Sequence, residues 1–157
     1  GHDGHGLRIV GLVISLHILG MYALSPLFGW AADRLGALKT ALFGLILLGA
    51  AAALVFVASG SLTAVMIALG LLGVGWSAST IAGSVLLANV DAGDVRVPLQ
   101  GATDALMSYG GAAAALLSAP LLEWVGFGGL AVAAALLVAP AALVGLGARS
   151  SRAAPSA

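Results

Sequence analysis

The sequence predicts an all-α fold, a polytopic bundle of about five helices that cross a membrane. Of its 157 residues, 61% are hydrophobic and only 8% are charged, and the mean hydropathy is +1.14. Soluble domains carry roughly 45–50% apolar and about 25% charged residues, so lipid must be the solvent for much of this chain. Five apolar stretches also come near the roughly 20 residues that a helix needs to cross a ~30 Å hydrocarbon layer. Their lack of alternation favours helices over barrel strands.

Short polar segments separate the apolar stretches and place the spans. Within a transmembrane domain of residues 9–148, the predicted spans cover residues 9–31, 38–58, 62–88, 98–122 and 128–148. Pro98 suits the first turn of the fourth helix. Residues 1–8 form an extracytoplasmic segment in this prediction. Residues 149–157 form a polar cytoplasmic tail that we expect to be disordered.

The fourth span also carries a seam of small residues. Gly111, Ala115 and Ala119 recur at intervals of four and are followed by Pro120. Small residues at this spacing let two helices approach closely, and a proline inside a helix bends it. We therefore expect close packing and a kink here, and a similar kink at Pro140 in the fifth span.

The basic residues predict the orientation of the chain. If five helices alternate, five of the six basic residues fall on one side of the membrane: Arg34, Lys39, Arg96, Arg149 and Arg152. Only Arg8 falls on the other side. Cytoplasmic loops are enriched in Lys and Arg, so we expect the N-terminus outside and the C-terminus in the cytoplasm. The high content of Ala and Gly suggests a bacterial source, and hence the inner (plasma) membrane.

Several classes of function find no support in the sequence. The chain has no cysteine, which excludes disulfides and thiolate metal sites. Its net charge of zero gives no electrostatic case for binding nucleic acid. No phosphate-binding glycine loop and no nucleophile with a nearby base is present, so we expect neither an enzyme nor a cofactor. His2, Asp3 and His5 lie among flexible glycines without a third strong ligand, so we expect no metal site.

The most distinctive segment is the turn between the first two spans, GWAADRLGALK at residues 29–39. Gly29 and Gly36 allow helix ends to approach closely and the backbone to turn sharply. Asp33 is able to accept hydrogen bonds from the free N–H groups that open the next helix. Arg34 and Lys39 hold the turn on the cytoplasmic side. On spacing alone, a plain turn with charges that set the topology remains an alternative.

These residues resemble the Gly-x-x-x-Asp-Arg-x-Gly-(basic) signature of major facilitator superfamily (MFS) transporters. The segment HILGMYALSPLFGW (17–30) before the turn is also similar to this family. Further along, LLGVGW (71–76) and QGATDALM (100–107) are similar to the tenth and eleventh helices of bacterial drug-efflux members. The resemblance implies that nearly the whole chain corresponds to the eighth through twelfth of twelve helices. The missing N-terminal helices, membrane lipid and a small-molecule substrate would then be its partners. The chain departs from the family at Ala37 and Leu38, where basic residues are usual.

Two ionisable residues are predicted to lie within the bilayer, Asp104 and His17. An acid inside a membrane is a functional candidate by default, which makes Asp104 a candidate for proton coupling. It lies roughly 9 Å along the helix from Pro98, where the positive end of the helix dipole also suits an interfacial acid. His17 lies near the middle of the first span and is a second candidate for proton relay. The commoner role for such a histidine is a hydrogen bond to a neighbouring helix.

A stripe of small and polar residues follows one face of the third span. It comprises Gly73, Ser77, Thr80 and Ser84, with Trp76 beside it. The resemblance implies that this helix lines a central cavity, which makes Trp76, Ser77 and Thr80 the candidate substrate path. The alternative is close helix packing through small residues.

Together, these features predict part of a secondary active transporter that moves a small molecule by alternating access about a midplane site. Proton coupling and efflux of a drug-like compound are the expected energy source and direction, the latter by resemblance only. The alternative from a different class is a small membrane interaction or assembly protein without transport activity. A nonfunctional truncated product is a third interpretation.

Overall fold

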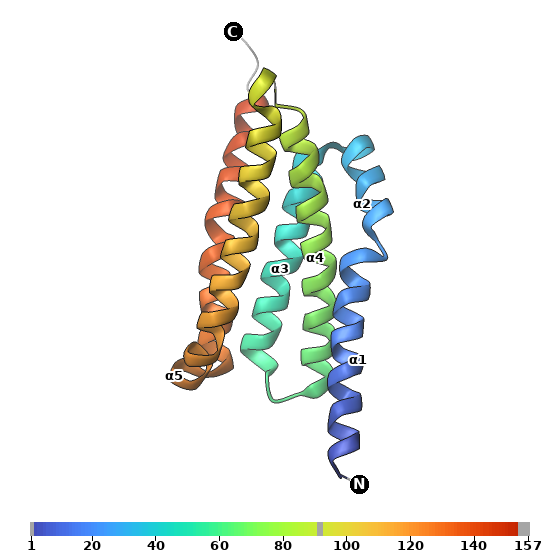
Figure 1. The fold of residues 1–157 in the computed structure, drawn as a ribbon, viewed down its shortest axis with the longest axis vertical. Coiled ribbons are helices and arrows are strands. Elements are labelled where there is room, and N and C mark those ends of the chain that lie inside the picture. Colours follow the sequence, from blue (N-terminus) through green and yellow to red (C-terminus); the bar gives the residue numbers. More distant parts are fainter. Residues whose placement is uncertain (1, 91–92, 154–157) are drawn as a thin grey trace.

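The computed structural model describes residues 2–90 and 93–153 of the chain, and the side chains of residues 7–90, 93 and 95–147 within them. In order, the elements are α1 (His2–Tyr22), α2 (Ser25–Ala31), the π-helical turn η1 (Ala32–Gly36), α3 (Ala37–Ala58), α4 (Leu62–Ala88), the 3₁₀ turn η2 (Gly93–Val95) and α5 (Arg96–Ala153). No strand occurs in the described residues, so the predicted all-α fold is confirmed (Figure 1).

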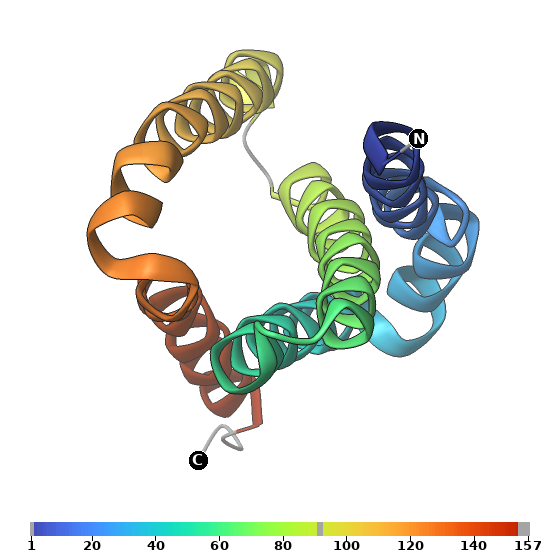
Figure 2. The same ribbon diagram turned by 90° about the horizontal axis from the view of Figure 1, so that it is seen from below.

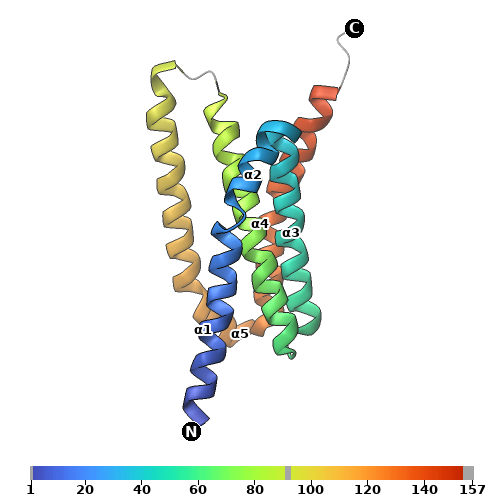
Figure 3. The same ribbon diagram turned by 90° about the vertical axis from the view of Figure 1, so that its right-hand side faces the viewer.

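Three helical stretches are long and apolar enough to cross a membrane: Leu7–Ala58, Leu62–Ala88 and Arg96–Gly147. The first and third have 52 residues each, which at ~1.5 Å per residue is about 78 Å, more than twice the thickness of the hydrocarbon layer. Each therefore has to fold back on itself, and Figure 3 shows both bends. One bend follows Gly36 (φ 102°), and the other lies at Gly126 (φ 66°, ψ −173°). We call residues 96–125 the first arm of α5 and residues 127–153 its second arm.

The first predicted span is a broken helix. Helix α1 ends at Tyr22, and α2 begins at Ser25, directly before Pro26. Proline has no N–H group and cannot continue the backbone ladder of the preceding turn, which accounts for the break. Ser25 Oγ donates a hydrogen bond of 3.1 Å to the Met21 carbonyl oxygen. The side chain therefore satisfies an acceptor within the interrupted turn.

The observed helices extend beyond the predicted spans at both ends of the chain. Helix α1 begins at His2, so residues 2–8 of the predicted extracytoplasmic segment are helical. Helix α5 continues to Ala153, so residues 149–153 of the predicted tail are helical rather than disordered; residues 154–157 lie outside the described part. Alanine and arginine are good helix formers, and they prolong the last helix beyond its apolar stretch.

Glycines allow close contacts between α3 and α4. A Cβ atom on Gly44 would lie 2.8 Å from the Gly75 carbonyl oxygen, and one on Gly75 would lie 2.9 Å from the Gly44 carbonyl oxygen. On the other side of α4, a Cβ on Gly20 of α1 would lie 3.1 Å from the Gly70 carbonyl oxygen. Membrane helices associate largely through such close backbone packing. Helix α4 therefore forms the centre of the bundle, with fully buried Ala78 and Ala82.

The first arm of α5 stands apart from the helices that pack together. Seen from below in Figure 2, α3 lies between α4 and the second arm of α5, whereas the first arm is separated from α4. All side chains from Val95 to Pro120 are exposed. The seam of Gly111, Ala115 and Ala119, predicted to pack closely, is exposed, and a Cβ on Gly111 would meet no atom within 4 Å.

Candidate functional site

The distinctive turn between the first two spans is formed by η1 and the start of α3. Gly36 adopts φ 102°, a conformation open mainly to glycine, and Thr40 Oγ1 donates a hydrogen bond of 3.2 Å to its carbonyl oxygen. The expectation that Asp33 caps the next helix was wrong: no side chain caps α3. The chain stays helical through η1, so Asp33 lies three residues before Gly36, the residue that flanks α3. The close approach of helix ends expected at Gly29 is not observed either, because a Cβ atom added to Gly29 would meet no atom within 4 Å.

The charged residues of this turn lie on the surface of the described structure. Asp33, Arg34 and Lys39 are all exposed. None of the three forms an ion pair or a side-chain hydrogen bond within the described residues. The structure therefore places them together at one end of the bundle without assigning them a partner.

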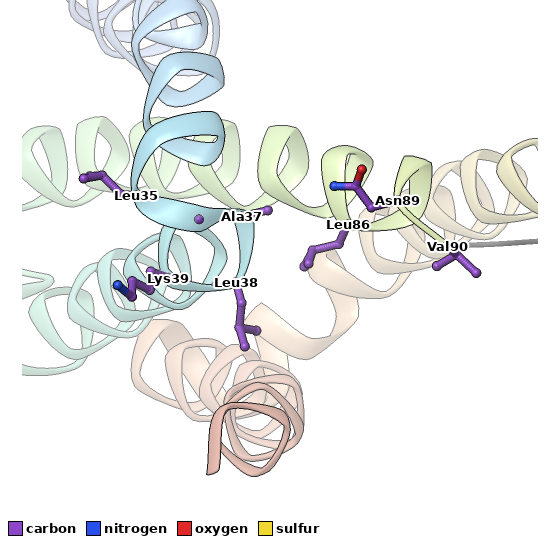
Figure 4. A pocket seen from close by; sticks show the side chains of 8 residues that line it. Leu35, Ala37, Leu38, Lys39, Leu86, Asn89 and Val90 are labelled. Atoms are coloured by element: carbon purple, nitrogen blue, oxygen red, sulfur yellow. The ribbon is translucent and has the colours of Figure 1, made fainter. Parts of the chain in front are cut away.

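A pocket of about 420 Å³ lies between this turn and the last turn of α4. Figure 4 shows its lining, with Leu86 of α4 pointing toward the start of α3, where Leu38 lies. Asn89 and Val90 lie at the end of α4 beside it. The pocket therefore lies where the charged turn meets the end of α4, the central helix of the bundle.

A larger groove of about 550 Å³ separates α4 from the first arm of α5. Its polar lining comes from both helices: Ser79, Thr80, Ser84, Gln100, Thr103 and Asp104. Asp104 follows the start of α5 at Arg96 by eight residues, so it lies roughly 12 Å from that end at ~1.5 Å per residue. Polar and charged groups inside an apolar span are costly and mark functional sites. This groove is therefore the candidate functional site.

His17 lies away from the groove, at the contact between α1 and α4. Its Nδ1 atom is 2.9 Å from the Leu69 carbonyl oxygen. A carbonyl oxygen only accepts, so Nδ1 carries the proton in this hydrogen bond. The geometry matches the alternative interpretation of His17 as a link between neighbouring helices.

Of the three path candidates on α4, only Thr80 lines the groove. Ser77 is 1% exposed, and its Oγ lies 3.3 Å from Ser25 Oγ of α2. The Trp76 ring meets Tyr22 of α1 edge to face, with 6.4 Å between ring centroids. The predicted stripe on α4 therefore faces two different neighbours. Gly73 and Ser77 pack against the first span, whereas Thr80 and Ser84 face α5.

Sequence reasoning missed Ser79 and Thr103, gave Gln100 no role in a site, and placed Ser84 in the stripe without counting it among the path residues. The signal that was available is the spacing of Gln100, Thr103, Asp104 and Met107, which repeats at three and four residues and keeps all four on one helix face. Among the described residues, no group of three His, Cys, Asp or Glu side chains is arranged to hold a metal ion. The side chains of His2, Asp3 and His5 lie outside the described residues.

The fold and the groove define a class: a multi-pass, all-α membrane protein with a groove between two of its helices that polar side chains line in part. The chain is 38% identical over 138 residues to the uncharacterized MFS-type transporter YddS of Bacillus subtilis (strain 168), a match that covers 87% of this chain and 32% of that protein. It is 40% identical over 118 residues to the uncharacterized MFS-type transporter YdeG of the same organism, covering 74% of this chain and 27% of that protein. The chain thus matches about a third of the length of these curated relatives, or less. No protein-family model and no solved structure matches it.

Proposed function

We propose that this chain is part of an MFS-type secondary transporter that moves a small molecule across the membrane by alternating access. Two MFS-type transporters at 38–40% identity support this proposal. The all-α bundle and the turn at residues 29–39, which resembles the family signature, support it further. In such transporters two helical bundles rock about a site near the middle of the membrane. The partner bundle would be supplied by N-terminal helices outside this sequence.

The observation that carries the proposal is the groove between α4 and the first arm of α5. It brings Thr80 of α4 and Asp104 of α5 to one cavity of about 550 Å³. Small-molecule sites usually measure roughly 300–1,000 Å³. A path for cargo needs an open cavity with polar side chains in its lining, and this groove has both.

The charged turn suits a latch between two bundles. Asp33, Arg34 and Lys39 are exposed, so they are free to pair with the partner bundle in one conformational state and to separate from it in the other. In the proposed orientation this end of the bundle is cytoplasmic, because Arg34, Lys39 and Arg96 lie there whereas Arg8 lies at the opposite end (Figure 1). The N-terminus of α1 would then lie outside.

Asp104 is the proposed proton-coupling residue. Its carboxyl group lies in the groove and has no hydrogen-bonding or ionic partner within the described residues. A carboxyl group that alternately meets the two sides of a membrane is able to carry a proton across with each cycle. His17 is a second candidate, although its Nδ1 proton is engaged by the Leu69 carbonyl oxygen. Efflux of a drug-like compound is the proposed direction.

Transport is tested with the protein at its natural length, reconstituted into proteoliposomes with a pH gradient and an internal pH dye. The proposal expects candidate substrates to change the proton flux, and Asp104→Asn to abolish that change. Glu123→Gln is the matched control, because Glu123 is also an exposed acid on α5 but lies outside the groove. Wild-type protein that shows no substrate-dependent flux would contradict the proposal.

A role in assembly is the second candidate function, and one observation favours it. Gly111, Ala115 and Ala119 form an exposed small-residue face on the first arm of α5, the kind of face that packs against another helix. Co-purification of a specific membrane protein, lost in Gly111→Leu and unaccompanied by substrate-dependent flux, would favour this function over transport.

A further inference from the structure

An apolar groove runs between α3 and the second arm of α5. Two adjoining hollows of about 370 and 210 Å³ form it, and both are lined by Gly49 of α3 and Ala135 of α5. Every residue that lines them is Gly, Ala, Val, Leu, Ile or Phe. On α3 the lining extends from Leu42 to Val57, about 22 Å at ~1.5 Å per residue. The groove is therefore longer than one leaflet of the hydrocarbon layer, which measures about 15 Å.

The two helices meet at each end of the groove and separate between these contacts. A Cβ on Gly145 would lie 2.8 Å from Leu42 Cδ2 at one end, and a Cβ on Gly128 would lie 3.7 Å from Phe56 Cδ2 at the other. Between them, a Cβ on Gly49 would meet no atom within 4 Å. This glycine therefore leaves space instead of bringing two helices together. Because α3 and α5 touch at both ends, the space is too narrow for a further helix of about 10–12 Å diameter, but a single hydrocarbon chain is thin enough.

The groove has an open edge on the side of α3 that faces away from α4. Gly44 is the α3 residue that meets α4, and Ile46 and Val57 lie roughly 200–220° around the helix from it. Their side chains are 67% and 81% exposed, respectively. Figure 2 shows α3 between α4 and the second arm of α5, so this edge lies on the outside of the bundle. In a membrane the edge is open to lipid.

A basic residue follows the groove on each helix, at the same end of the bundle. Lys39 precedes Leu42 by three residues and Arg149 follows Leu146 by three, which places each on the groove face of its helix. Lys39, seen at the start of α3 in Figure 4, is exposed and forms no ion pair or side-chain hydrogen bond within the described residues. At the other end, residues 51–62 and 126–134 contain no charged residue. The groove is thus apolar along its length and basic at one end only.

We propose that this groove binds one acyl chain of an acidic phospholipid, with the headgroup phosphate at the end where Lys39 and Arg149 lie. An acyl chain matches the apolar lining, and a negative headgroup matches the two basic residues. A zwitterionic lipid offers the same chain without the net charge. The inference does not depend on the proposed transport function, because neither helix face involved lines the groove between α4 and the first arm of α5.

Photolabelling of the natural-length protein in phosphatidylcholine vesicles tests this inference. Two trace probes carry the same diazirine-bearing acyl chain, one on phosphatidylglycerol and one on phosphatidylcholine, and mass spectrometry maps the labelled peptides. We expect the phosphatidylglycerol probe to label residues 42–57 and 131–146 at least fivefold more than the phosphatidylcholine probe, since one basic residue near the membrane surface contributes about fivefold to the binding of acidic lipid. Lys39→Gln should lower this ratio and leave labelling by the phosphatidylcholine probe within about twofold.

A variant that fills the groove gives a second readout. Gly49→Leu places a side chain in the space between the helices and should reduce labelling by the phosphatidylglycerol probe at least fivefold. Ala50→Leu is the matched control, because Ala50 is the next residue on α3, is exposed and does not line the groove, and it should stay within about twofold of wild type. Ala135→Leu fills the same groove from α5 and replaces Gly49→Leu if that variant fails to fold.

Three results would overturn the inference. Equal labelling by the two probes would show that the basic end does not select an acidic headgroup, and this comparison needs no variant. Labelling spread evenly over all exposed apolar faces, or unchanged in both groove-filling variants, would show only the lipid that surrounds any membrane protein. Absence of label from residues 42–57 and 131–146 would show that another segment or another chain covers the groove.

Discussion

The glycine contact between α3 and α4 allows the sharpest prediction about stability. Gly44→Ala adds one Cβ atom, which would lie 2.7 Å from the Ser79 amide nitrogen and 2.8 Å from the Gly75 carbonyl oxygen, and would also meet Ser79 Oγ. Ordinary contacts of a Cβ atom begin near 3.4 Å. Two of the three neighbours are backbone atoms of α4, so a side-chain rotation cannot relieve the clash and the helices have to separate.

The size of the effect follows from a matched control on the same helix. Gly49→Ala adds the same atom at a position with no neighbour within 4 Å. Both changes gain the same helix propensity, roughly 1 kcal/mol over glycine, so this contribution cancels in the comparison. The remainder is the cost of overpacking, typically 1–3 kcal/mol. We therefore expect Gly44→Ala to be less stable than Gly49→Ala by about 2 kcal/mol.

Unfolding in mixed micelles with increasing SDS measures this difference. Trp76 lies on α4 next to Gly75 and beside Tyr22 of α1. In a background in which Trp30 and Trp124 are replaced by Phe, its fluorescence reports the loss of packing around α4, and circular dichroism follows the loss of helix. Equal unfolding midpoints for the two alanine variants would refute the reasoning, since they would show that α3 and α4 do not meet at Gly44.

Three further predictions concern the first span and its turn. His17→Leu removes the hydrogen bond to the Leu69 carbonyl oxygen and should lower stability by about 0.6 kcal/mol, the average for such bonds between membrane helices; an unchanged SDS midpoint would contradict it. Gly36→Ala places a side chain at φ 102° and should cost roughly 1–3 kcal/mol in the same assay, whereas Gly60→Ala, where no positive φ is recorded, should cost less. Asp33→Asn should reduce transport by the natural-length protein at an unchanged membrane level, measured by flux and immunoblot; full transport would leave the turn with a role in topology alone.

The apolar character of the chain made its fold class predictable. Spans as long as residues 38–58 and 62–88 leave a helix as the one structure that satisfies the backbone in lipid, and the observed α3 and α4 end within a residue of those predicted bounds. The break between Tyr22 and Ser25 was harder to place, because Pro26 in a membrane helix kinks the chain in some contexts and ends the helix in others.

The candidate site was predictable only in part. Asp104 and Thr80 stand out as polar residues in apolar spans, and the structure brings both to one groove. The register between helices decides which face of α4 meets which neighbour. The sequence of a single helix does not specify that register. For this reason Ser77 and Thr80, three residues apart, were assigned one role, although Ser77 contacts Ser25 of α2 and Thr80 faces α5.

The central claim, that these helices are one part of a two-bundle transporter, is tested most directly by the size of the protein in its source membranes. An antibody raised against the tail sequence of residues 149–157 would detect it by immunoblot. The account predicts a band more than twice the 15.3 kDa of this chain, in line with relatives of which the chain spans 32% and 27%. A band near 15.3 kDa would contradict the account, and would place the assembly function ahead of transport.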